Sequence, residues 1–348
     1  LLFIVAATSI SSVTQVKKLL VGMLIVTVLS SVYGLGQVYL GWPVVTTNNE
    51  EFSKGLILKL TPGARPNSTF AGHYDLAIYL SIALTFIAAL FWVYKRKLVK
   101  LMLMISGLLA LGLLALTAAR VSFVAMIVGV ASVWWGMGKR WLVVLLIIAC
   151  GVTVMAVPQL RNRVFATIEV NILPAIKSVT KSTPAPTRQP TASEGAITNP
   201  YVAQTIVPGE PTTYTELEVY RSFKIRTDVN WPRAINAFKK DPLIGTGYSS
   251  ISIASDNDYL RSLGEVGLLG TASLLLIFVM IARRLRSGLK KVTGVEKAVL
   301  VGSLMMLPVI AVTATFIDVL EASKIATLVW MWLGISWAIS RRYQDHKE

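Results

Sequence analysis

The chain has 348 residues, of which 54% are hydrophobic and only 15% are charged. Soluble domains carry about 25% charged residues, so this composition excludes an ordinary water-soluble globule. The formal net charge of +16 would by itself suggest a nucleic-acid-binding protein, but the apolar bulk excludes that class. With one cysteine, Cys150, and two histidines, the sequence excludes an intrachain disulfide and a cysteine- or histidine-rich metal site, and we expect no cofactor.

Apolar runs long enough to cross a bilayer recur along the chain. A helix needs about 20 apolar residues to span a hydrocarbon core, and backbone groups in lipid must pair within the helix. We therefore predict an all-α polytopic membrane protein with about nine transmembrane helices. The first is a shortened span, so we expect further chain before Leu1. The predicted spans are residues 1–14, 19–40, 74–94, 98–118, 121–138, 141–157, 262–282, 298–317 and 324–340.

Clusters of lysine and arginine predict how these spans are oriented. All of the clusters fall on one side if every run crosses once, and such clusters mark the cytoplasmic side. The chain then divides into an N-terminal transmembrane bundle at 1–157, a large outer loop at 158–258 between the sixth and seventh spans, and a C-terminal bundle at 259–348. The clusters are Lys17–Lys18, Lys95–Lys97 with Lys100, Lys139–Arg140, Arg283–Arg286, Lys290–Lys291 with Lys297, and Arg341–Arg342 with Lys347.

The large outer loop contains two kinds of sequence. Residues 182–215 are rich in proline, threonine, serine and alanine, which predicts a disordered insert that cannot form a core. Residues 216–240 have apolar side chains at helical spacing, which predicts a helical segment. The run Asp241–Gly247 ends that segment because it contains proline and two glycines.

Arg120 is the only charged residue between 101 and 138. A single helix of that length would be nearly two bilayers long, so we expect the chain to turn at Arg120 on the outer side. Charges at membrane depth are costly and are usually functional, and the five donors of a guanidinium suit a phosphate group. The alternative is an arginine that extends to the outer lipid headgroups.

Other polar groups on the outer side suggest chemistry less strongly. Asp256 or Asp258 could act as a general base, although loop carboxylates are usually only solvated. Arg261 and Glu265 are four residues apart and share a helix face, which favours an internal ion pair. His73 could be a base, a hydrogen-bond partner or an interfacial residue. Together these groups suit either an anionic lipid-anchored substrate, such as a polyprenyl diphosphate, or a transported organic anion.

Three segments stand out together: Arg65–Leu80, Leu116–Ala125, and a series of short motifs from Arg226 to Gly270. They resemble the O-antigen ligase and O-antigen polymerase superfamily of bacterial membrane glycosyltransferases. Arg65–Leu80 resembles the family's entry to a span. Leu116–Ala125 resembles the family's turn around an arginine, with Ala119 and Val121 in place of the usual serine and glycine. The resemblance covers roughly residues 60–280. The third segment follows the family's loop order through Arg226, Trp231, Ala234, Asp241–Gly247, Asp256–Leu260 and Gly264–Gly270.

This resemblance implies a metal-independent enzyme of surface polysaccharide biosynthesis in the bacterial cytoplasmic membrane. It would transfer an oligosaccharide from an undecaprenyl-diphosphate donor to a hydroxyl of an acceptor glycan or lipid, at the periplasmic or extracellular face. Arg120 and Arg226 match the family's diphosphate-binding positions, and Arg65 is a further match. Asp256 stands where the ligase pattern has histidine, which favours a polymerase-like enzyme. The expected catalytic carboxylates are Asp256 and Asp258, and the expected acceptor or structural residues are His73, Asn257, Tyr259, Arg261 and Glu265.

Two other classes of function fit the same sequence. A transporter or flippase of lipid-linked sugars would move its substrate without forming a glycosidic bond. A membrane scaffold would use the 182–215 insert to contact cell-wall polymers. In each case the expected partners include membrane lipids and no nucleic acid.

Overall fold

The computed structural model describes residues 1–44, 59–61, 63–172, 214–251, 255–320 and 323–343. Every named element in these ranges is a helix, which confirms the predicted all-α class. All but the last two residues of the insert predicted at 182–215 lie outside the described ranges. The N-terminal half contains α1 (Leu2–Ser9), α2 (Val13–Tyr39), α4 (His73–Val93), α5 (Lys97–Leu116), α6 (Arg120–Gly136), α7 (Trp141–Ala156), α8 (Pro158–Thr167) and the π-helix η2 (Ile168–Ile172). The C-terminal half contains α10 (Tyr214–Ile225), the π-helix η3 (Arg226–Asn230), α11 (Trp231–Lys240), α12 (Asp258–Gly288), α13 (Gly294–Thr313) and α14 (Ser323–Arg342).

Five of the described helices are long and apolar enough to cross a membrane, namely α2, α4, α5, α12 and α13. The number rises to six if α7 and the following helix, which is bent away by 102°, count as one broken span. The predicted count of nine is therefore not confirmed. The predicted first span forms a helix of only 8 residues, and α6 has 17 residues, so α6 is only about 26 Å long at 1.5 Å per residue.

The centre of the bundle is α4, which packs against α5, α6 and α13. Its middle residues are buried on all sides and mostly apolar, as expected of a helix enclosed by others. Small residues allow the close approach of its neighbours. A Cβ atom on Gly129 of α6 would lie 2.5 Å from the Thr85 hydroxyl oxygen of α4 and 2.5 Å from a methyl carbon of Val309 of α13.

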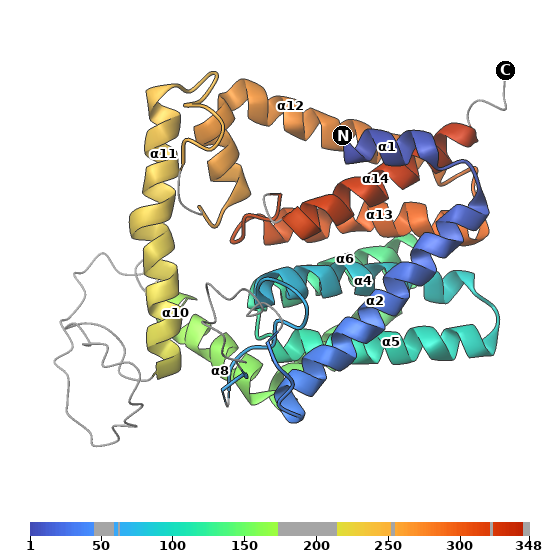
Figure 1. Cartoon of the computed structure of the whole chain (residues 1–348), viewed down its shortest axis with the longest axis horizontal. Coiled ribbons are helices and arrows are strands. Elements are labelled where there is room, and N and C mark those ends of the chain that lie inside the picture. The colour runs from blue at the N-terminus through green and yellow to red at the C-terminus, as the bar shows by residue number, and fades with distance from the viewer. Residues whose placement is uncertain (45–58, 62, 173–213, 252–254, 321–322, 344–348) are drawn as a thin grey trace.

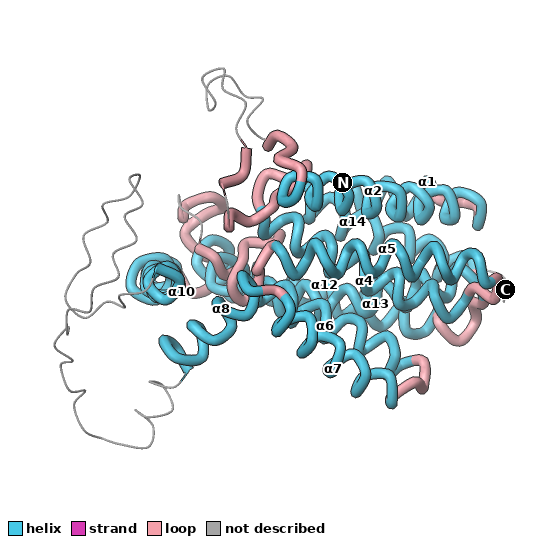
Figure 2. The backbone as a smooth tube through the Cα atoms, turned by 90° about the horizontal axis from the view of Figure 1, so that it is seen from below, coloured by secondary structure: helices cyan, strands magenta, loops and turns pink. Residues whose placement is uncertain are grey.

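The two ends of the bundle differ in structure. At one end, which we call the loop end, α10, η3 and α11 form a single helical segment that runs across the bundle helices (Figures 1 and 2). Helix α8 lies beside α10 at this end. At the opposite end, which we call the basic end, lie the turn after α6 and the last turn of α12, with the basic residues Lys139, Arg140, Arg283 and Arg286.

Helix α12 is broken near its loop end at Gly267. This residue has φ of 65° and ψ of −168°, a conformation open to glycine and costly for other residues. The loop after α11 fits into the break, where the Thr246 N–H donates to the Gly264 carbonyl oxygen at 3.0 Å and the Gly247 N–H donates to the Glu265 carbonyl oxygen at 2.9 Å. A Cβ atom on Gly267 would lie 2.4 Å from the Leu243 carbonyl oxygen. Glycines on both sides of this contact allow the two backbones to approach closely, and the hydrogen bonds fasten the loop after α11 to the first turns of α12.

Candidate functional site

A cavity of about 400 Å³ lies at the loop end of the bundle. Its walls come from the start of α4, the α5–α6 turn, α8, α10 with the first residue of η3, and the segment after α13. Three arginines from three different elements line this one space. The lining residues are Tyr74, Ala118, Ala119, Arg120, Val121, Ser122, Arg163, Thr167, Val219, Ser222, Phe223, Arg226, Phe316 and Ile317.

The tight turn between α5 and α6 places Arg120 at the first position of α6. Ala118 in this turn has φ of 50°, a left-handed conformation that alanine rarely adopts. The Thr117 hydroxyl stabilises the turn, since it donates to the Leu114 carbonyl oxygen at 2.6 Å and accepts from the Ala119 N–H at 3.4 Å. The turn therefore places the Arg120 side chain at the cavity, and α6 begins at the same residue.

Arg120 contributes positive charge without a carboxylate partner among the residues described. Its guanidinium donates to the Thr167 hydroxyl and, at 3.4 Å, to the Arg163 carbonyl oxygen, both on α8. The residue that caps α6 makes no side-chain hydrogen bond. The first N–H groups of a helix lack partners within it, so those of Val121 and Ser122 are available at the cavity wall. A helix N-terminus with an arginine beside it favours an anionic ligand.

Glu218 on α10 joins two arginines that are far apart in the sequence. One of its carboxylate oxygens accepts a hydrogen bond from Arg163 on α8, and the other accepts from Arg65 at 2.5 Å. Burial acts to raise the pKa of Glu218, but the hydrogen bonds and positive charges of Arg163 and Arg65 hold that pKa below its usual value. Arg65 also donates to His73 Nε2 at 2.7 Å. Because arginine cannot accept, Nε2 must be the unprotonated nitrogen in this arrangement.

The third arginine of the cavity, Arg226, lies at the junction of α10 and η3. Pro232 lacks an N–H and its ring crowds the carbonyl four residues earlier, which explains why the backbone widens to a π-helix just before it. Arg226 donates to the carbonyl and hydroxyl oxygens of Ser222 at 3.0 and 2.7 Å. Its Nε lies 3.2 Å from Asp256 Oδ2. The ion pair brings Asp256 to the edge of the cavity.

Asp256 is half-buried and, among the described residues, is held by a neighbouring group at only one of its two carboxylate oxygens. Its backbone φ of 52° is a left-handed conformation. Its pKa is raised, chiefly by burial and also by the nearby charge of Asp318, although Arg226 acts to lower it. Arg226 contacts Oδ2, and Oδ1 accepts no hydrogen bond from the residues described. One oxygen is thus held in place and the other remains available.

Asp318, after α13, organises the short segment that carries Asp256. Its two carboxylate oxygens accept from the backbone N–H groups of Ser255, Asp256 and Asn257 at 2.9, 3.2 and 2.9 Å. They also accept from the Ser255 hydroxyl at 2.8 Å and from Arg261 Nη1 at 3.3 Å. A single carboxylate therefore fixes three successive backbone amides and determines where Asp256 lies.

The remaining predicted site residues surround this segment rather than the cavity. Asn257 caps α12, since its Oδ1 accepts from the Leu260 N–H at 2.9 Å. Asp258 is buried, and its Oδ2 accepts from the N–H groups of Val319 and Leu320 at 2.8 and 3.2 Å. These contacts tie the start of α12 to the segment after α13.

Three further residues of this group stabilise α12. Tyr259 donates to the Ala311 carbonyl oxygen of α13 at 2.8 Å. Arg261 Nε lies 3.3 Å from Glu265 Oε1, within the same helix and nearly shielded from solvent. The structure thus separates two groups. Arg120 and Arg226 line the cavity, Asp256 pairs with Arg226, and Arg65 and His73 lie behind the lining through Glu218. Asn257, Asp258, Tyr259, Arg261 and Glu265 support the helix beside it.

Charge at the cavity is unbalanced. Three guanidinium groups, from Arg120, Arg163 and Arg226, line the cavity, and no carboxylate is among its lining residues. Glu218 and Asp256 pair with Arg163 and Arg226 from beside the lining. A dianion in this partly buried space would find hydrogen-bond donors as well as positive charge. No group of three or more potential metal ligands occurs in the described part of the chain.

Residues 105–275 match the family model described as O-antigen ligase. The chain belongs to the O-antigen ligase/polymerase superfamily. The matched range contains the three arginines that line the cavity, together with Glu218 and Asp256, whereas Arg65 and Asp318 lie outside it. A search of curated proteins finds no match to this chain.

Membership in the superfamily gives this chain a general role. It is a multi-pass bacterial membrane protein with a glycosyltransferase-like role in polysaccharide biosynthesis. The family comprises membrane ligases and polymerases that act on lipid-linked glycans in a lipid environment. A cavity lined by arginines at one end of an O-antigen ligase domain is consistent with such substrates.

Three residues of the site were not identified from the sequence. Arg163 and Glu218 lie in or near stretches rich in other charged residues, so neither stands out. Arg163 does have a signal, because it follows an apolar helix within a few residues and would lie near the membrane surface. Asp318 has a similar signal, since it is the first charge after the apolar run of α13.

Proposed function

We propose that this protein is an O-antigen polymerase/ligase-like glycosyltransferase. It transfers an oligosaccharide from an undecaprenyl-diphosphate donor to an acceptor hydroxyl at the outer face of the cytoplasmic membrane. The observation that carries this proposal is the single cavity lined by Arg120, Arg163 and Arg226 inside an O-antigen ligase domain. The acceptor is a glycan or a lipid, and no cofactor takes part.

The charge of the cavity suits the proposed donor. A diphosphate esterified at both ends carries two negative charges, and three guanidinium groups line the cavity that would receive it. Arginine binds phosphate oxygens through pairs of N–H groups, and the start of α6 offers further N–H donors. We assign the diphosphate to Arg120, Arg163 and Arg226. Arg65 does not line the cavity; it donates a hydrogen bond to Glu218, which in turn holds Arg163.

In the proposed reaction, the acceptor hydroxyl oxygen attacks the anomeric carbon of the donor sugar. The bond between that carbon and the diphosphate oxygen breaks, and the bonding electrons leave with the diphosphate. Negative charge grows on the diphosphate during this step, and the arginines stabilise it more in the transition state than in the ground state. The hydroxyl proton passes to Asp256, whose raised pKa brings it closer to neutral pH than an ordinary aspartate.

Asp256 is the better candidate for the base than Asp258. Asp256 lies beside Arg226, so a hydroxyl that approaches the donor's diphosphate is also near this carboxylate. Asp258 accepts two backbone hydrogen bonds and is buried, which suits support of the loop. Arginines supply the positive charge in this mechanism, so we expect transfer to be independent of metal ions.

The orientation of the protein follows from its basic residues. The clusters around Lys139, Arg283 and Arg341 lie at the end of the bundle opposite the cavity, and such clusters mark the cytoplasmic side. The cavity is then at the periplasmic or extracellular face. A transporter of lipid-linked sugars remains the competing function, but its binding site is expected near the middle of the membrane, between broken helices.

The direct test mixes purified protein with an undecaprenyl-diphosphate oligosaccharide and separates the glycan products by size. We expect longer or transferred chains, with formation unaffected by EDTA and lost in Arg120→Ala and Arg226→Ala. Arg233→Ala is the matched control, since Arg233 is exposed on α11 and does not line the cavity. Normal product formation by folded Arg120→Ala and Arg226→Ala would refute the diphosphate assignment. Movement of the donor across a vesicle membrane without a new glycosidic bond would favour the transporter.

A further inference from the structure

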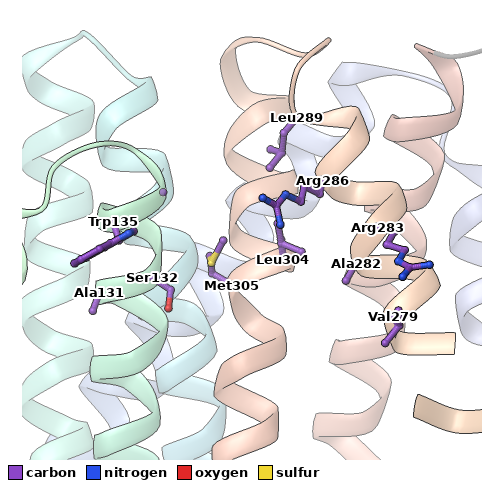
Figure 3. Close-up of a pocket in the computed structure, with 11 residues that line it drawn as sticks. Ala131, Ser132, Trp135, Val279, Ala282, Arg283, Arg286, Leu289, Leu304 and Met305 are labelled. Carbon is purple, nitrogen blue, oxygen red and sulfur yellow. The ribbon is translucent and has the colours of Figure 1, made fainter. Parts of the chain in front are cut away.

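A second, larger cavity lies at the basic end of the bundle, far from the arginine site. Its volume is about 800 Å³, and it is lined by residues of α6, of α13 and of the end of α12 (Figure 3). We call it the basic-end cleft. Its lining residues are Ala131, Ser132, Trp135, Gly136, Val279, Ala282, Arg283, Arg286, Leu289, Leu304 and Met305.

The walls of this cleft are apolar and made partly of small residues. Ala131 and Gly136 on α6 face Leu304 and Met305 on α13, and a Cβ atom added to Gly136 would meet only the Met305 methyl group, at 4.0 Å. Val279 is 44% exposed and lies on a transmembrane helix, so this part of the wall faces the bilayer. An acyl chain could therefore enter the cleft from the membrane.

Two arginines at the mouth of the cleft, Arg283 and Arg286, have no carboxylate partner among the described residues. Arg283 and Arg286 are three residues apart on the last turns of α12, so they share a helix face. Neither forms an ion pair with any described residue, whereas Arg342 at the same end pairs with Glu296 at 2.9 Å. Figure 3 shows Arg286 among the cleft residues, with Trp135 on the facing helix.

The depth of the cleft matches the level of lipid headgroups. Trp135 is at the end of α6, and the Arg140 guanidinium lies 4.8 Å from the centre of its ring. Tryptophan and arginine are both concentrated where the hydrocarbon meets the headgroups. Basic pockets between transmembrane helices on the cytoplasmic side are suited to anionic phospholipids.

We propose that the basic-end cleft binds one anionic phospholipid. The lipid phosphate contacts Arg286 and Arg283, and one acyl chain lies in the apolar cleft between α6 and α12, against the α13 side chains Leu304 and Met305. The lipid thereby covers the α13 surface that α6 and α12 leave open. The proposed orientation of the protein would put this lipid in the cytoplasmic leaflet. The proposal that the cleft binds a lipid does not depend on that orientation.

The test uses the full-length protein in nanodiscs that contain phosphatidylglycerol and phosphatidylcholine, followed by native mass spectrometry. The double variant Arg283→Gln/Arg286→Gln should retain phosphatidylglycerol at least about fivefold less than the wild type. The matched control is Lys290→Gln/Lys291→Gln, which removes the same charge from exposed residues that do not line the cleft. An equal loss of lipid in both double variants would overturn the proposal, because it would show a general charge effect.

A second pair of variants tests the apolar part of the cleft without a change in charge. Gly136→Leu should fill the cleft and reduce lipid retention. Gly112→Leu on α5 should not, since open space surrounds Gly112 and it does not line the cleft. Retention by Gly136→Leu equal to that of the wild type would overturn the placement of the acyl chain. Glycan transfer by all four variants reports separately on the arginine cavity, so failure of one proposal is distinguishable from failure of the other.

Discussion

Arg163 offers the sharpest test of the site, because it was not among the residues predicted from the sequence. Its side chain is 12% exposed, lines the arginine cavity and donates through Nη2 to Glu218. A guanidinium has five N–H donors, so the others remain for a ligand. We predict that Arg163→Ala lowers kcat/KM for the lipid-diphosphate donor.

The magnitude follows from the contacts that would be lost. A hydrogen bond to a charged group contributes about 1.5–3 kcal/mol, which corresponds to a fall of about 10- to 150-fold in kcat/KM. The cost in stability is smaller. Glu218 is 37% exposed and keeps Arg65, so we expect a loss of about 1 kcal/mol or less and a small fall in Tm.

The assay measures the initial rate of glycan transfer against donor concentration, with a thermal melt for each variant. Arg161→Ala is the matched control, since Arg161 is on the same helix and does not line the cavity. Arg163→Lys should recover only part of the rate, because an ammonium group cannot serve Glu218 and a phosphate with the same planar geometry. Folded Arg163→Ala with kcat/KM within about twofold of the wild type would refute the reasoning.

Three further predictions address the loop and the bend that support the site. In a pH profile of kcat, the raised pKa of Asp256 should put the acid limb above pH 3.8, because the base is lost as pH falls through that pKa, and Asp256→Asn should lower kcat and remove the limb. Asp318→Ala leaves three backbone N–H groups without their acceptor and should lower both Tm and kcat, and a wild-type kcat would contradict its positioning role. Gly267→Ala places a Cβ atom 2.4 Å from the Leu243 carbonyl oxygen in a left-handed backbone, so we expect the free energy of unfolding to fall by about 1–3 kcal/mol in denaturant titrations. Gly112→Ala, where open space surrounds the glycine, should have little effect.

The sequence by itself determined the class of the protein and the most exceptional residue of the site. Burial of apolar helices in lipid is a local requirement, so runs of apolar residues predict an all-α membrane protein without knowledge of their packing. The isolation of Arg120 is local in the same sense, because a lone charge in 38 apolar and polar residues must have a reason to be there. The glycines at the α11–α12 contact also lie in two motifs recognised in the sequence, Asp241–Gly247 and Gly264–Gly270.

Only the tertiary structure decided which of the other charged groups share the cavity. Arg65 and Arg163 meet at Glu218 across 153 and 55 residues of chain, and Asp318 reaches the backbone of Asp256 across 62. No local pattern predicts such contacts, since they depend on how α8, α10 and the segment after α13 pack at the loop end. The same packing separates Asp256, beside the cavity, from Asp258, which supports a backbone turn. Two aspartates that are equivalent in the sequence thus acquire different environments, because the fold turns one toward an arginine and the other toward buried amides.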